Sequence, residues 1–273
     1  MTCESPPVAA GPRLSLVVPL YRSERLLPEL FRRIGDLHIE GGLELVLVND
    51  GSPDATSEVC RRLLGGFPGN ITFVDLCRNF GEHNAVITGL RYARGAYIVT
   101  MDDDLQNPPE EAVRLLEEAE KHRYDVVYSR YAEKKHERWR NLGSAFANRV
   151  ADFVLDKPPG LYLSSFRCMS SLVASAVCRY EGPYPYIDGL ILQSASRIGT
   201  IEVGHDERSV GQSGYNVRKL LRLWSSLFLN FSVAPLRVAG VLGAAIALLG
   251  FLDALMVIGE WFFLGTPPGW GSL

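Results

Sequence analysis

The stretch Gly95-Ala-Tyr-Ile-Val-Thr-Met-Asp-Asp-Asp-Leu-Gln-Asn-Pro-Pro109 is the part of the sequence that decides the fold. Tyr97 to Met101 is a short apolar run rich in strand-forming residues, which predicts a buried strand. It ends abruptly in Asp102, Asp103 and Asp104, and Pro108-Pro109 then begins a new helix. Three adjacent carboxylates repel one another unless a positive charge lies among them, so we expect a divalent cation at this end of the strand.

The expected ligands of this cation alternate along the chain as Asp102, Asp104 and Gln106. Oxygen ligands suit a hard ion such as Mg²⁺ or Mn²⁺, and Mg²⁺ commonly completes its shell with water and substrate phosphates. The pattern therefore predicts a metal that holds a diphosphate. The alternative is an acidic loop that caps the following helix at its positive end. Three aspartates directly behind an apolar strand favour the metal.

Size and composition set limits on the class of protein. The chain has 273 residues, 47% of them hydrophobic, with a net charge of -3, which is enough for one large domain with an appendage. The near-neutral charge gives no sign of nucleic-acid binding. Five scattered cysteines fit a reduced compartment better than a disulfide framework. Residues 1–12 lack the pattern of a signal peptide and are expected to form a flexible tail.

Strands and helices are predicted to alternate through the first half of the chain. The predicted strands are 14–20, 43–48, 71–76, 97–101 and 125–129, and the predicted helices begin near Ser23, at Asp54, after Gly81 and at Glu110. Such alternation is typical of an α/β fold with a mostly parallel, Rossmann-like sheet. Ligands of open parallel sheets bind beyond the carboxyl ends of the strands, where several polar residues of this chain gather.

The second half of the domain has a looser pattern. A strongly charged segment over 131–140 precedes a helix expected over 141–155. Two shorter helices separated by Gly182-Pro183 follow, and Ile201 to Val203 is expected to form an edge strand. The catalytic domain is thus predicted to occupy residues 13–216.

From residue 217 the chain changes character. Residues 217–235 mix leucine and aromatic residues with arginine and lysine, which predicts an amphipathic helix in a membrane interface, although a helix covering the sheet is the alternative. Residues 236–264 are predicted to cross the membrane, and 265–273 to form a turn that leads toward a further span. Basic residues before the span place the domain on the cytoplasmic face of the inner membrane. Asp253 inside the span suggests a partner helix or a homo-oligomer.

Five motifs in this order resemble those of family 2 glycosyltransferases of the polyprenyl-phosphate type, which include dolichol-phosphate mannose synthase and undecaprenyl-phosphate glycosyltransferases. They are Val17-Val-Pro-Leu-Tyr21 with Glu24, Val48-Asn-Asp-Gly-Ser-Pro-Asp54, Arg78-Asn-Phe-Gly-Glu-His83, Met101-Asp-Asp-Asp-Leu-Gln-Asn-Pro-Pro-Glu110 and Arg208-x-x-Gly-x-Ser-x-Tyr215. The resemblance covers roughly residues 13–240.

The resemblance implies a glycosyltransferase-A fold that moves a sugar, with inversion, from a nucleotide-diphosphate sugar to a membrane polyprenyl phosphate such as undecaprenyl or dolichyl phosphate. It implies that the nucleoside pocket is lined by Pro19, Tyr21, Glu24 and Asp50. Asp102, Asp104 and Gln106 would bind metal and diphosphate, and Asp103 would contact the substrate beside them. Arg130 and Arg140 would lie near the acceptor phosphate, and Arg208 and Ser213 would close over the diphosphate.

The chain departs from the family pattern at three places. Relatives often carry Lys where Gly214 stands, and some carry Gly-Asp in place of Ser164-Ser165. Ser165 can then hydrogen-bond substrate but cannot act as a carboxylate. Relatives also commonly have two or more spans, where this chain shows one.

The expected chemistry explains why a strong general base is not required. A phosphate monoester is mostly ionised at neutral pH because its second pKa is about 6, so it is already a nucleophile. Bringing two anionic substrates together instead requires cations, and the guanidinium groups of Arg130, Arg140 and Arg208 grip phosphate in a fork. Two alternatives remain. A processive polysaccharide synthase is disfavoured because Gln-x-x-Arg-x-Trp is absent, and a non-catalytic sugar-nucleotide-binding membrane protein is disfavoured by the intact aspartates.

Overall fold

The computed structural model describes residues 11–131, 161–182, 185–204 and 234–265. The chain divides into two compact units, residues 1–216 and residues 217–273, and each is described by itself. Several expectations fall outside the described residues. They are the helix over 141–155, most of the amphipathic segment 217–235, and the positions of Arg140, Arg208, Ser213 and Gly214.

The first unit is built on one seven-stranded sheet with the order β3-β2-β1-β4-β6-β5-β7. The strands are β1 Leu14–Leu20, β2 Leu43–Asn49, β3 Asn70–Asp75, β4 Tyr97–Thr100, β5 Val126–Tyr131, β6 Arg167–Ser170 and β7 Ile198–Val203. Strands β1 to β4 run parallel, and β5 runs parallel to β7. Strand β6 runs antiparallel to both of its neighbours, β4 and β5, so the sheet is mixed.

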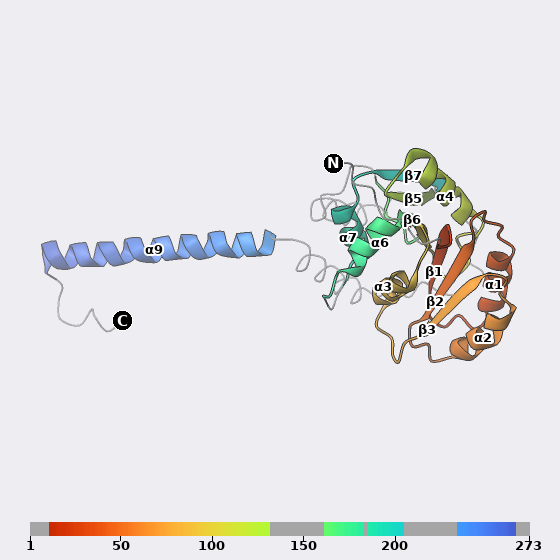
Figure 1. Ribbon diagram of the computed structural model, residues 1–273. Helices are drawn as coiled ribbons and strands as arrows, with labels where there is room; N and C mark the ends of the chain where they lie inside the picture. Colours follow the sequence, from red (N-terminus) through yellow and green to blue (C-terminus); the bar gives the residue numbers. More distant parts are fainter. Residues whose placement is uncertain (1–10, 132–160, 183–184, 205–233, 266–273) are drawn as a thin grey trace, which may run out of the picture. The chain divides into compact units, whose positions relative to one another are not determined.

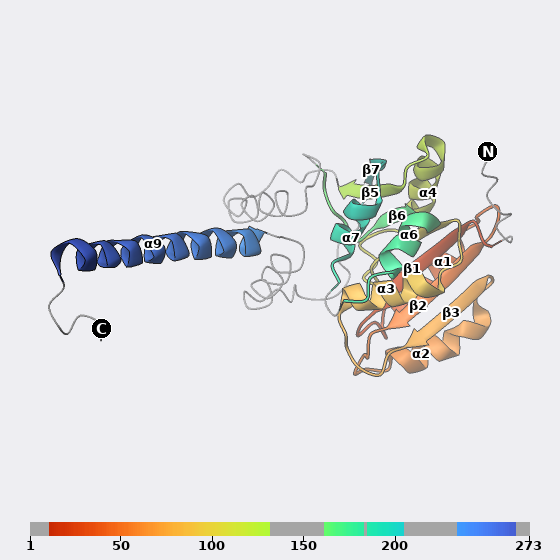
Figure 2. The same cartoon turned by 60° about the vertical axis from the view of Figure 1, so that its left-hand side comes forward.

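Helices cover both faces of the sheet, as Figures 1 and 2 show. They are α1 Leu27–Gly35, α2 Thr56–Leu63, α3 Glu82–Tyr92, α4 Glu111–His122, α6 Ser171–Cys178 and α7 Ile187–Ser194, with a short 3-10 turn, η1, over Leu64–Gly66. Helices α1, α2 and α4 lie on one face, and α3, α6 and α7 lie on the other. This is the layered arrangement expected when strands and helices alternate.

The main hydrophobic core lies between the sheet and the helices α1 and α4. Its fully buried members include Leu14, Leu16, Leu20, Leu30, Leu45, Leu115, Phe166 and Cys168. The opposite face is held by a close approach of α3 to the sheet. A Cβ added to Gly89 of α3 would lie 2.4 Å from Cγ1 of Val17, so only glycine fits at this crossing. Packing on both faces of the sheet therefore holds in place the carboxyl ends of its strands, where the loops between strands and helices lie.

The regular helix α1 begins at Leu27, four residues after the predicted start near Ser23, although the Ser23 carbonyl already accepts the N–H groups of Leu26 and Leu27. The preceding residues make other contacts. The hydroxyl of Ser23 donates to Asp103, and the Glu24 carboxylate accepts the Ala55 N–H at 3.1 Å. These contacts tie the loop after β1 to the loops after β4 and β2. The helix starts only after this loop, with Pro28 in its first turn.

The sheet is mostly parallel, as predicted, because four of its six described strand pairings are parallel. Strand β6, which supplies the two antiparallel pairings, is absent from the sequence-based prediction. Only four residues long and containing Arg167, it gives neither an alternating nor a continuous apolar pattern. The edge strand expected at 201–203 is confirmed and is longer, as β7. The remaining predicted strands agree with the structure to within two residues at each end.

The second unit contains helix α9, Ala234–Leu264. Within it, Gly240–Glu260 is long and apolar enough to cross a membrane, and none of that stretch is buried. Twenty-one residues at 1.5 Å each give about 31 Å, which matches the thickness of the hydrocarbon core. The expected membrane-crossing segment therefore coincides with a helix of suitable length.

Candidate active site

Polar residues meet at the edge of the sheet where β1, β2 and β4 end and where β6 begins. Because β6 is antiparallel, its first residues lie beside the last residues of β4 and β5. The pairing of Arg167 with Thr100 and Tyr128 places Ser165 two residues further out, opposite Asp102 on one side and Arg130 on the other. This edge brings together residues from four of the five sequence motifs.

Asp102 and Asp104 are oriented by hydrogen bonds on the loop after β4. The hydroxyl of Ser165 donates to Oδ2 of Asp102 at 2.6 Å, and the Gln106 N–H donates to Oδ1 of Asp104 at 3.1 Å. Leu105, between Asp104 and Gln106, has a φ of 58°, which is in the left-handed region that bulky residues rarely occupy. Its buried side chain belongs to the core. Core packing therefore holds this strained turn, which is typical of functional loops.

Asp103 is held by the protein itself. Its Oδ2 accepts from the Ser23 hydroxyl and from the Tyr21 N–H, the latter at 3.1 Å. The pKa of Asp103 is raised to about 6, mainly by burial and to a smaller extent by the charges of Asp102 and Asp104, while the two hydrogen bonds act in the opposite direction. The residue expected to contact substrate thus joins the end of β4 to the loop after β1.

Asp50 is buried, and its carboxylate shapes the loop before α3. The N–H groups of Phe80 and Gly81 donate to its two oxygens at 2.7 and 2.9 Å. The adjacent Gly51 has a φ of 59°, and a Cβ there would lie 2.3 Å from the backbone of Arg78. Asp50 therefore fixes the start of α3 against the end of β2.

The other residues expected at the nucleoside pocket lie at the same edge. Pro19 is half-buried near the end of β1, and the Tyr21 side chain is exposed. Glu24 is half-buried and bonded to the Ala55 N–H. The Arg22 guanidinium lies over the exposed Tyr21 ring, 5.4 Å from its centroid, so a base that stacks there would use the remaining exposed ring surface.

A buried charged cluster beside this edge has no counterpart in the sequence-based prediction. Arg167 of β6 forms a close ion pair with Asp188 of α7, and the Tyr128 hydroxyl donates to the same carboxylate at 3.1 Å. Arg167 is 3% exposed, and its Nε has no hydrogen-bond partner among the described residues. The two charged residues are 21 positions apart in the sequence, with no local pattern that could have revealed the pairing.

Glu82 and His83, at the start of α3, border this cluster. Burial raises the pKa of Glu82 to about 7, and Asp102 is the next largest cause, followed by the opposing effect of Arg167. Burial lowers the pKa of His83, whose ring packs edge-on against Tyr186 with centroids 5.5 Å apart. His83 is therefore neutral at physiological pH. Glu82 is exposed at the surface, yet the surrounding protein atoms desolvate its carboxylate, which lies in electrostatic reach of Asp102.

The donor set after β4 fits a hard divalent cation. Among the described residues, no three His, Cys, Asp or Glu side chains are placed to hold an ion by themselves. Asp102 and Asp104 instead offer two hydrogen-bonded, hard oxygen donors. Mg²⁺ is commonly bound through one or two carboxylates, with water and phosphate oxygens completing the shell. This arrangement suits an ion that arrives with a nucleotide.

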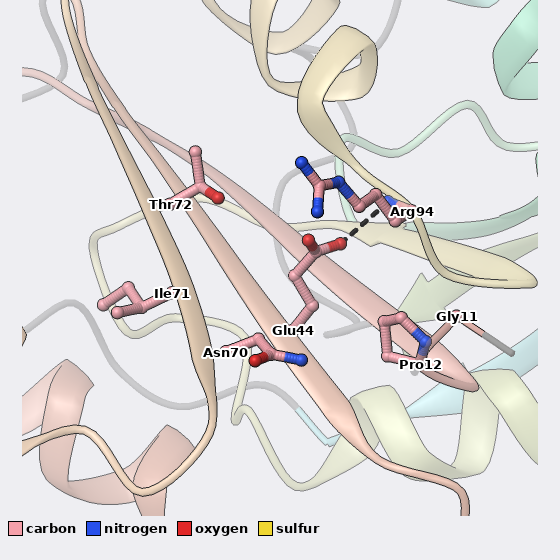
Figure 3. Close-up of a pocket in the computed structure, with 7 residues that line it drawn as sticks. All are labelled: Gly11, Pro12, Glu44, Asn70, Ile71, Thr72 and Arg94. Carbon is pink, nitrogen blue, oxygen red and sulfur yellow. Dashed lines mark hydrogen bonds between the residues drawn. The ribbon is translucent and has the colours of Figure 1, made fainter.

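A surface pocket lies at the opposite edge of the sheet, near the amino ends of β1 to β3 (Figure 3). Its polar centre is Glu44, which accepts from the Ser15 hydroxyl at 2.5 Å and from the Arg94 N–H at 2.8 Å. These bonds join β1, β2 and the turn before β4. Ligands of such sheets bind at the carboxyl ends of the strands. We therefore interpret the hydrogen bonds of this pocket as structural and do not place the active site there.

Comparison with known proteins places the chain in a family. Residues 15–174 match the family model of glycosyl transferase family 2. An undecaprenyl-phosphate 4-deoxy-4-formamido-L-arabinose transferase of Pseudomonas aeruginosa is 36% identical over 253 residues, covering 90% of this chain and 73% of that protein. The chain belongs to glycosyl transferase family 2 and is a glycosyltransferase. The resemblance to the polyprenyl-phosphate type, inferred from the motifs, is confirmed by this relative.

Solved structures confirm the glycosyltransferase-A fold. Glucosyl-3-phosphoglycerate synthase of Mycobacterium tuberculosis, crystallised with Mn²⁺, UDP and phosphoglyceric acid, superposes with a TM-score of 0.57 at 16% identity, covering 80% of this chain and 78% of that one. TarS 1-349 of S. aureus gives a TM-score of 0.53 at 18% identity, with coverage of 80% and 66%. At these identities the likeness concerns the fold.

Proposed function

We propose that the protein transfers a sugar from a nucleotide-diphosphate sugar to a polyprenyl phosphate, with inversion at the anomeric carbon. The observation that carries this proposal is the register at the sheet edge, where Ser165 lies between the aspartates after β4 and Arg130 at the end of β5. One side of this edge has ligands for a metal-bound diphosphate, and the other has a cation for a second phosphate. The named activity of the Pseudomonas aeruginosa relative supports the same reaction.

On the donor side, Asp102 and Asp104 would hold Mg²⁺ or Mn²⁺ with Gln106 nearby. When bound, a divalent ion stabilises the negative charge of a departing nucleoside diphosphate. The chain itself orients both carboxylates through Ser165 and the Gln106 N–H. Asp103 acts indirectly, because it holds the loop after β1, on which Tyr21 and Glu24 would line the nucleoside position next to Pro19. Asp50 also acts indirectly, because it holds the loop before α3.

On the acceptor side, Arg130 is exposed near the end of β5, opposite Ser165 on the extension of β6. It would bind the lipid phosphate in a fork, together with Arg140. Arg208 and Ser213 would close over the donor diphosphate. A phosphate acceptor is already ionised at neutral pH, so Ser165 needs only to hydrogen-bond and no described side chain has to remove a proton.

We assign α9 to the inner membrane, with the catalytic unit on the cytoplasmic face. In this assignment residues 1–12 are a tail, 13–216 the catalytic domain, 217–235 an interfacial helix, 236–264 the span and 265–273 a turn. The length of the apolar stretch Gly240–Glu260 supports a span. Asp253 is costly in lipid unless it faces a protein partner or water, which favours association with another helix, including one from a second copy.

The proposed function is tested by incubating the full-length protein, in detergent, with nucleotide sugars, Mn²⁺ and undecaprenyl phosphate. A lipid-linked monosaccharide with inverted anomeric configuration is expected, and chelation of the metal should stop its formation. A polymer of sugars would instead indicate a processive synthase. Nucleotide binding without any product would indicate a protein that has lost catalysis.

A further inference from the structure

The sheet register sets the order of three residues along the proposed site. Asp102, Ser165 and Arg130 lie side by side on three neighbouring strands or their extensions, in the order β4, β6, β5. Neighbouring strands are about 4.8 Å apart, so the backbones at Asp102 and Arg130 are separated by about 10 Å. If the diphosphate lies at Asp102 and the acceptor phosphate at Arg130, the sugar that passes between them lies over Ser165.

Helix α3 adds a carboxylate to this position. Glu82 is the first residue of α3, and the start of that helix is fixed because Asp50 accepts the N–H groups of Phe80 and Gly81. Glu82 is exposed at the surface, although the surrounding protein atoms desolvate its carboxylate. It interacts electrostatically with Asp102, Arg167, Asp188 and Asp103, all of which lie at or next to the same edge. The next residue of α3, His83, packs against Tyr186, two residues before the Asp188 that pairs with Arg167 of β6. The start of α3 therefore borders the sugar position at Ser165.

None of the charged groups named so far is left to neutralise the Glu82 carboxylate next to the sugar position. Arg167 is already paired with Asp188, and both are at least nine-tenths buried. His83 is neutral because burial lowers its pKa. A bound divalent ion would be matched by Asp102, Asp104 and the donor diphosphate. Arg130, on the far side of Ser165, is occupied by the acceptor phosphate in the proposed reaction.

We propose that Glu82 is a specificity-determining residue, which makes the sugar position accept neutral or amino sugars and reject sugars that carry a carboxylate. This inference rests on the proposed function, since it requires a donor diphosphate at Asp102. A uronate donor would bring its carboxylate next to Glu82 and the Asp102 side chain, where like charges repel. The hydroxyl of Ser165 is neutral, and it already donates to Asp102. A neutral sugar hydroxyl or an ammonium group can donate to Glu82 without this repulsion.

The first step of the test finds the nucleotide. Full-length protein in detergent with Mn²⁺ is titrated with UDP, CDP, GDP and dTDP, and binding is followed by the rise in melting temperature. For the base that binds, the dissociation constants of its glucose, glucosamine and glucuronate donors are then compared. The titrations are run at pH 8, because Glu82 has a pKa of about 7 and is mostly ionised there. We expect the wild type to bind the glucuronate donor at least about tenfold more weakly than the glucose donor, because the two carboxylates repel each other near the protein surface.

Variants then assign this preference to one side chain. Glu82→Gln should reduce the preference to about threefold or less, and Glu82→Lys should reverse it, because the charge at this position is removed or inverted. Glu58→Gln is the matched control, since Glu58 is also an exposed first-turn glutamate of a helix on this sheet. It should leave the preference unchanged. Melting temperatures of all variants without ligand establish that each is folded.

The possible results distinguish an error in the role of Glu82 from an error in the proposed function. Equal affinity for glucose and glucuronate donors in the wild type, or a preference that Glu82→Gln does not alter, would overturn the role of Glu82 and leave the proposed function intact. Failure of every nucleoside diphosphate to bind in the presence of Mn²⁺ would overturn the proposed function, and the role of Glu82 with it.

Discussion

Removing the Asp188 carboxylate should destabilise the catalytic unit strongly. Its partner Arg167 has a side chain that is 4% exposed, and that of Asp188 is 12% exposed. Asp188→Ala leaves a buried guanidinium without its counter-ion and removes the acceptor of the Tyr128 hydroxyl. Breaking such a buried pair from one side costs about 3–5 kcal/mol. For a unit of about 200 residues, each kcal/mol lowers the melting temperature by about 2–4 °C, so a fall of roughly 6–20 °C is expected.

The assay is thermal unfolding in detergent followed by near-UV circular dichroism, with urea titration as a second measure. Glu29→Ala is the control, because the Arg32–Glu29 pair is also an ion pair but has side chains that are 60% and 48% exposed. Exposed pairs contribute about 0.2–1 kcal/mol, so its melting temperature should change by no more than about 4 °C. Asp188→Asn should fall between the two, since an amide oxygen still accepts hydrogen bonds. A loss below about 1 kcal/mol for Asp188→Ala would refute the buried-pair argument.

Three further predictions concern the site and the membrane. Ser165→Ala should weaken Mn²⁺-nucleotide binding about tenfold, measured by calorimetry, because Asp102 loses the hydrogen bond that orients it; unchanged affinity would mean that Asp102 does not depend on Ser165. Asp103→Asn should gain stability relative to wild type as the pH rises from about 4 to about 7, in melts with a chelator. Burial raises the pKa of Asp103 in the folded state to about 6, so wild-type stability falls as that group ionises; parallel pH profiles would contradict this. Removing residues 217–273 should release the catalytic unit into the soluble fraction of a cell extract, and its recovery in the membrane pellet would exclude α9 as the anchor.

The sequence was most informative where a pattern is local. The run Tyr97 to Met101 followed by three aspartates predicts a strand end with a polar loop, and the structure has β4 and the Asp102–Asp104 loop at that place. Helix α4 was predicted almost to the residue, because its apolar positions repeat at helical spacing. The fold class follows from the same alternation of strands and helices.

Features that depend on long-range pairing could not be predicted in this way. Strand β6 is four residues long and joins the sheet only through its partners on β4 and β5. Its Arg167 is a charged residue that tolerates burial only because Asp188 of α7 is folded against it. Asp50 and Asp103 were identified as site residues from their motifs. That they bind the N–H groups of neighbouring loops became visible only in three dimensions.

The central claim is that the carboxylates behind β4 hold the cation that binds the donor diphosphate. Its most direct test is a crystal of the protein with Mn²⁺ and the nucleoside diphosphate that binds, with data collected for the anomalous signal of manganese. The account predicts a manganese peak within coordination distance of Asp102 or Asp104 that also contacts the diphosphate. A well-defined nucleotide elsewhere, with no peak beside these carboxylates, would contradict it.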